Sequence, residues 1–207
     1  MFRPNYAQDA PPTSIEVDGA RYPVNVDFRV WIDILDMARA LYPEPRALDE
    51  ALDNARVIGR MQTLAFGGVL EGVDGAQALR AMAEFARGYP TMVGGGADEP
   101  DGEELLSFDY DVNALVLAIR NQSGIDLSYR RKEPFHWWEF LLEAQTLCGE
   151  HYILRAVEAR ASKSDSPEAR RAKRRLRLPG KPTAQELRDL AALRAAAEDT
   201  QEVRNAD

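Results

Sequence analysis

Residues 134–148 read Pro-Phe-His-Trp-Trp-Glu-Phe-Leu-Leu-Glu-Ala-Gln-Thr-Leu-Cys and carry the clearest structural signal in the chain. Apolar side chains recur there at helical spacing, at Trp137, Phe140, Leu141, Ala144, Leu147 and Cys148. Glu139 and Glu143 lie on the opposite face of the same helix. This period predicts an amphipathic helix over 134–148 with a proline in its first turn. Its apolar stripe should pack into a core.

The four large rings of this stretch cannot all face one side of a helix. Trp137 and Phe140 belong to the stripe, whereas Trp138 is turned about 100° away from Trp137. Phe135 also points elsewhere. Two interpretations stay open: a second layer of the same core, or exposed anchors for a partner, because aromatic residues dominate interface energetics. Phe135 and Trp138 are therefore candidate partner-binding residues.

Helical spacing recurs on both sides of this stretch. Phe28 and Trp31 begin one such stripe, and Asp27 can cap the helix that carries them. Further helices are predicted over 47–58, 74–87, 109–124, 150–161 and 183–207. The predicted core includes Phe28, Trp31, Trp137, Phe140 and Leu141.

The segment from Ser14 to Val24 has a different pattern. Ile15 and Val17 alternate with polar residues before the turn pair Asp18-Gly19, which is typical of a β-hairpin. The chain is therefore predicted to be mainly α: a helical bundle-like domain with a short N-terminal β-hairpin and flexible arms.

Composition divides the 207-residue chain into segments. Residues 94–96 are glycines, and 97–104 contain five acidic residues and no basic one, so we expect a flexible linker there. The predicted organisation is a flexible arm over 1–12, hairpin plus helices over 13–88, an acidic linker over 89–106, a helical core over 107–162, a basic mobile segment over 163–182 and a C-terminal helix over 183–207.

The overall charge and the cysteine content limit the class of protein. A formal net charge of −8 argues against wholesale binding of nucleic acid. A single cysteine excludes an intrachain disulfide and fits a reducing cytosol. The first residues have no apolar signal-peptide region, and no apolar run reaches the roughly 18 residues of a membrane span.

Few residues suggest chemistry. Cys148 and His151 have a Cys-x-x-His spacing, and His136 is the second histidine. Structural zinc usually takes four such ligands, and a Cys–His nucleophile pair lacks an orienting third group. We interpret the histidines as helix-surface residues and the thiol as buried. The sequence therefore predicts no enzyme, no catalytic residue, no metal and no cofactor.

The segment from Arg170 to Lys181 holds seven basic residues and no acidic one. It could attach to nucleic acid, or it could be a solvated helix or an arm that docks on an acidic protein surface. No aromatic residue is interleaved to stack on bases, so protein contact is favoured. Arg171, Arg174 and Arg175 are the candidate binding residues.

Several blocks of the sequence resemble a known family. They are Val17–Trp31, Phe108-Asp-Tyr-Asp111 leading to Gly124-Ile-Asp-Leu127, Phe135-His-Trp-Trp-Glu-Phe140, and the Ser- and Arg-rich stretch from Ser162 to Leu178. Together they resemble the gene-product-fifteen family of phage tail proteins, which are encoded beside the tape-measure gene. The resemblance covers about residues 13–180.

The resemblance implies a tail assembly chaperone in the cytoplasm of the bacterial host. Its expected partners are the tape-measure protein and, as a second candidate, the tail-tube protein; self-association stays open. One alternative is a structural tail-completion or connector component of the virion. Another is a nucleic-acid-binding packaging accessory that uses the basic segment.

Overall fold

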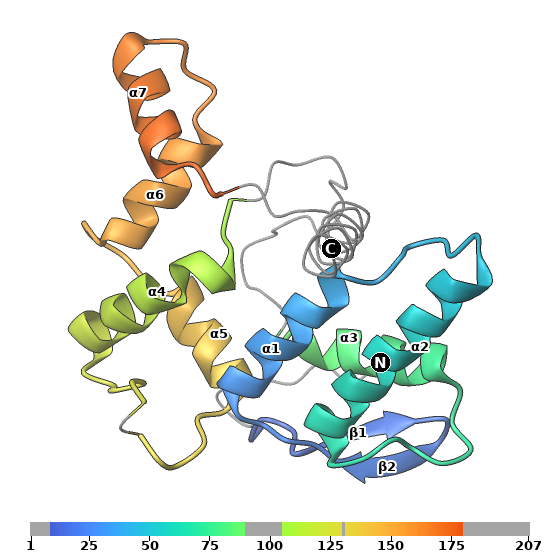
Figure 1. The fold of residues 1–207 in the computed structure, drawn as a ribbon. Coiled ribbons are helices and arrows are strands. Elements are labelled where there is room, and N and C mark those ends of the chain that lie inside the picture. The colour runs from blue at the N-terminus through green and yellow to red at the C-terminus, as the bar shows by residue number, and fades with distance from the viewer. Residues whose placement is uncertain (1–8, 90–104, 130, 180–207) are drawn as a thin grey trace, which may run out of the picture.

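A computed structural model describes residues 9–89, 105–129 and 131–179. The protein is mainly α, with one two-stranded antiparallel hairpin near the N-terminus. Figure 1 shows the hairpin beside α2 and α3, with α1 and α5 in the middle and α6 and α7 standing away from this body. The elements are β1 (Ser14–Val17), β2 (Ala20–Pro23), α1 (Phe28–Arg39), α2 (Leu48–Phe66), α3 (Gly75–Ala86), α4 (Phe108–Ser123), α5 (Trp137–Gln145), α6 (Tyr152–Ala161) and α7 (Pro167–Leu176).

The hairpin closes at the predicted turn. Asp18 has φ 51° and Gly19 has φ 77°, two positive values that match the twist of a two-residue hairpin turn. Ile15 and Val17 are buried while the intervening glutamate is exposed. The alternation of β1 therefore places one face of the strand on the core.

Three of the predicted helices have the expected start or end. Asp27 caps α1 by accepting a hydrogen bond from the backbone N–H of Arg29, and α4 ends at Gly124 in the left-handed conformation. Asp74 caps α3 in the same way as Asp27. The helix predicted over 47–58 is longer: α2 continues to Phe66 and ends at Gly67.

One aromatic cluster joins the two halves of the chain. Phe28 of α1 stacks on Phe140 of α5 with ring centroids 4.6 Å apart, and Trp31 lies 4.5 Å from Phe85 of α3. Trp137 stacks on Phe140 at 5.7 Å. Segments 13–88 and 107–162 therefore share a single core.

The start of α5 is attached to the start of α1 through the backbone. The Phe28 N–H donates to the Phe135 carbonyl at 2.9 Å, and the Trp137 N–H donates to the Val26 carbonyl at 2.7 Å. These bonds form an isolated antiparallel bridge between Asp27 and His136. The sequence had predicted Pro134 in the first turn of this helix. That prediction is wrong, because α5 begins at Trp137 and Pro134 lies before it.

The predicted segments differ in how far the structure describes them. The flexible arm at 1–12 and the acidic linker at 89–106 lie largely outside the described residues, and the C-terminal helix at 183–207 lies wholly outside them. Within the basic segment 163–182, residues Pro167–Leu176 form α7. The sequence had predicted a mobile segment there, with a solvated helix as one interpretation of its basic run.

Candidate functional site

The two predicted partner anchors lie inside the molecule. Phe135 is 9% exposed and Trp138 is 8% exposed. The Trp138 indole packs against Phe85 and Tyr89, and its N–H donates to the Phe85 carbonyl at 2.8 Å. The interpretation of Phe135 and Trp138 as exposed partner-binding residues is therefore wrong, and both form a second layer of the core.

The two adjacent tryptophans of α5 bind the C-terminal end of α3 through hydrogen bonds. The last carbonyls of a helix have no partner within the helix. The indole of Trp138 donates to the carbonyl of Phe85, and that of Trp137 donates to the carbonyl of Ala86 at 2.9 Å. The Trp-Trp pair thus buries two large rings while satisfying both indole N–H groups.

The sequence had predicted His136 on the helix surface, and this is wrong because the side chain is buried. Its Nδ1 accepts from the Trp138 N–H at 3.0 Å and caps α5. Its Nε2 lies 3.0 Å from the Pro12 carbonyl, and this pair of bonds fits the neutral ring protonated at Nε2. Burial lowers the pKa of His136, although the Pro12 carbonyl and Glu139 oppose this shift.

The predicted buried thiol is also corrected, because Cys148 is exposed. Its backbone N–H donates to the side chain of Gln122 at 2.9 Å. Within the ranges that the structure describes, no three His, Cys, Asp or Glu side chains are grouped as metal ligands.

The predicted core residues lie where the helical spacing places them. Phe28, Trp31, Trp137 and Phe140 are each at most 2% exposed. Leu141 is half-buried and packs against the edge of the same cluster. The apolar stripe of α5 is therefore used for folding.

The basic candidates gather on α7, which forms a helical hairpin with α6. Ser166 caps α7 and Pro167 opens it, while Lys173, Arg174 and Arg175 occupy its last turn, where the helix dipole favours cations. Arg171, Arg174 and Arg175 are all exposed. They do not all border the same hollow, however: Arg171 and Arg174 border an open hollow with Pro167 and Arg170, whereas Arg175, one helical turn after Arg171, borders a different one.

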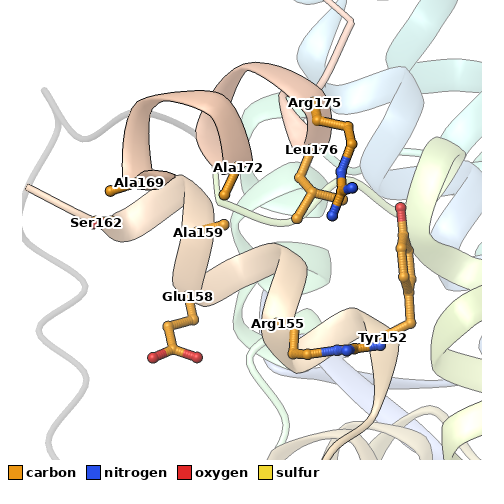
Figure 2. A pocket seen from close by; sticks show the side chains of 9 residues that line it. All are labelled: Tyr152, Arg155, Glu158, Ala159, Ser162, Ala169, Ala172, Arg175 and Leu176. Atoms are coloured by element: carbon orange, nitrogen blue, oxygen red, sulfur yellow. The ribbon is translucent and has the colours of Figure 1, made fainter. Parts of the chain in front are cut away.

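Arg175 borders a groove between α6 and α7. The groove has a volume of about 400 Å³. Figure 2 shows its lining, with alanines between the helices and the side chains of Tyr152, Arg155 and Arg175 toward one end. The lining residues are Tyr152, Arg155, Glu158, Ala159, Ser162, Ala169, Ala172, Arg175 and Leu176.

A buried ion pair holds the hairpin on the body of the protein. Arg160 of α6 is 7% exposed and binds Asp111 of α4 through both carboxylate oxygens, at 2.7 and 3.0 Å. The same guanidinium donates to the Leu105 carbonyl at 2.8 Å and to the Leu176 carbonyl at 2.7 Å. One side chain thus fastens the start of α4 to the end of α7.

The sequence reasoning missed this pair, although the sequence contains a signal for it. Arg160 follows Ile153 and Ala156 at i+7 and i+4, so a charge occupies a position in the apolar stripe of α6. Asp111 precedes Leu115 by four residues and occupies the same kind of position in α4. Opposite charges in the stripes of two helices indicate a buried pair, since a lone buried charge is costly.

No protein-family model, curated protein or solved structure matches this chain. Among the described helices, none combines the length and the apolar character of a membrane span.

Proposed function

We propose that this protein is a non-enzymatic tail assembly chaperone of a bacteriophage, which binds the tape-measure protein in the cytoplasm of the host. The resemblance of the blocks from residue 13 to 180 supports this role. The observation that carries it is the α6–α7 hairpin, which stands away from the body and presents exposed basic side chains beside an alanine-lined groove.

The proposed binding mode follows from this surface. A tape-measure protein is a long helical chain with apolar stripes that would aggregate before the tail tube encloses it. A groove between two helices can cover part of such a stripe. Charges at the rim speed the encounter and set the orientation more than they add affinity, which suits a chaperone that must release its partner.

The packaging accessory is the second candidate, because α7 is basic. Protein is favoured because the groove floor consists of small apolar side chains, which offer no stacking platform for a series of bases. A gel-shift titration separates the two. Strongly salt-dependent DNA binding at physiological ionic strength supports a role as a packaging accessory, since phosphate contacts release counterions.

Co-expression with the tape-measure protein tests the proposal. A tagged chain should keep the tape-measure protein soluble and co-purify with it, and should be absent from mature virions by mass spectrometry. An insoluble tape-measure protein that never co-purifies contradicts the chaperone role. Recovery of the chain from purified virions supports the connector alternative instead.

A further inference from the structure

We propose that the groove between α6 and α7 binds an acidic amphipathic helix of the partner, with a carboxylate held between Arg155 and Arg175. Small apolar side chains of that helix would cover the alanines of the floor. This inference rests on the proposed function, because the tape-measure protein is the partner expected to supply the helix. It goes further by naming the chemistry that the groove recognises.

The floor of the groove is apolar and shallow. Ala159 comes from α6, and Ala169 and Ala172 come from α7. Figure 2 shows these small side chains between the two helices, where they line the groove. The volume of about 400 Å³ accommodates a few small or medium side chains of one helix face.

The charged groups are at one end of the groove. Arg155 extends from α6 and Arg175 from α7, and Figure 2 shows both beside the ring of Tyr152. Glu158 also borders the groove, but its carboxylate points away from Arg175. Two guanidinium groups on opposite walls offer several donors to one carboxylate.

The groove is held in shape by the buried Arg160. Its Nε–H donates to the carbonyl of Leu176, which lines the groove next to Arg175. The rest of its guanidinium is fixed by Asp111 of α4. The distance between the two walls is thus set at this end before a partner arrives, which lowers the entropic cost of binding.

The charge of the hairpin selects the occupant. After Glu168, α7 carries five basic residues and no acidic one. A basic or neutral helix would bring no group that pairs with Arg155 and Arg175, whereas an acidic helix does. Like charges facing each other cost free energy and so exclude cationic partners.

The test uses the full-length chain and a capped alanine–glutamate peptide of about 18 residues, long enough for partial helicity, measured by fluorescence anisotropy. The peptide should bind at low salt. Arg175→Gln and Arg155→Gln should each weaken binding about fivefold, the upper end for a solvent-exposed ion pair. Arg170→Gln removes the same charge about 140° further round α7, at the other hollow, and should change affinity less than twofold.

Two control peptides separate helix recognition from simple charge attraction. Lysine in place of each glutamate should abolish binding, and prolines that prevent helix formation should weaken it strongly. The inference is overturned if the wild-type chain does not bind the glutamate peptide, if Arg170→Gln weakens binding as much as Arg175→Gln, or if the proline peptide binds equally well. If the peptide binds but the tape-measure protein does not co-purify, only the chaperone role is overturned. If the tape-measure protein co-purifies but the peptide does not bind, only the assignment of the groove as a helix-binding site is overturned.

Discussion

Replacing Asp111 with asparagine removes the carboxylate that neutralises the buried guanidinium of Arg160. The substitution keeps the size of the side chain, so it creates almost no cavity. It also places an amide in contact with donors at 2.7 and 3.0 Å. The expected result is a large loss of stability, together with loosening of the α6–α7 hairpin.

The magnitude follows from the burial of the pair. The two side chains are 7% and 4% exposed, and breaking a buried pair by removing one partner costs about 3–5 kcal/mol. For a protein of this size, that corresponds to a decrease in Tm of roughly 6–20 °C. The total stability of a domain is about 5–15 kcal/mol, so part of the protein is expected to unfold on warming.

Urea denaturation measures this effect. The loss should depend little on salt, because water and ions do not reach the pair. Asp165→Asn is the matched control: it removes a carboxylate 4.0 Å from Arg170 that is 97% exposed, and its stability should equal that of the wild type. The double variant Asp111→Leu/Arg160→Met should lose less stability than the single variants Asp111→Leu and Arg160→Met lose together. The reason is that no unpaired charge stays buried in the double variant. A change below about 1 kcal/mol for Asp111→Asn would refute the reasoning.

Three further predictions concern the core. Trp138→Phe should lower stability by about 1–3 kcal/mol in urea denaturation, because it removes a buried hydrogen bond and part of a buried ring; an unchanged midpoint contradicts this. Stability should fall as the pH decreases below about 6.5, because burial lowers the pKa of His136 and the unfolded chain takes up the proton first. This fall should be smaller in His136→Asn, which retains a cap, and an identical pH profile argues against the assignment. Gly88→Ala should melt at a lower temperature than Gly124→Ala: both positions have φ 74°, but only the added methyl at Gly88 meets a side chain, at 2.7 Å. Equal melting temperatures contradict that contact.

Local patterns predicted much of the fold. The stripe of α1, the turn at Asp18-Gly19 and the end of α4 at Gly124 all depend on residues close in sequence. Helical spacing also identifies Trp137 and Phe140 as core residues. Such features are encoded within a few residues, so they can be found without knowledge of the tertiary structure.

Long-range pairings account for the errors. Trp138 faces away from the stripe of its own helix, and only the position of α3 reveals that it is covered. His136 is buried because Pro12 and Phe85 pack around it, far away in the sequence. A helical wheel shows the direction of a side chain but not the element that lies in that direction.

The candidate site was predicted in part. The basic run predicted a charged surface and left a helix as one interpretation, but it did not predict that Arg175 borders a groove with Arg155. That helix has no buried residue, and its apolar stripe consists only of Ala169, Ala172 and Leu176. Its start is instead marked by Ser166 and Pro167, a capping pair that is recognisable in the sequence.

Hydrogen–deuterium exchange of the full-length chain, alone and with the tape-measure protein, tests the central claim most directly. We predict slower exchange over residues 152–176 in the complex, with β1, β2 and α2 unchanged. Arg175→Gln should reduce that protection and Arg170→Gln should not. Protection of β1, β2 or α2 while α6 and α7 exchange at the same rate as in the free chain would contradict the assignment of the hairpin as the partner surface.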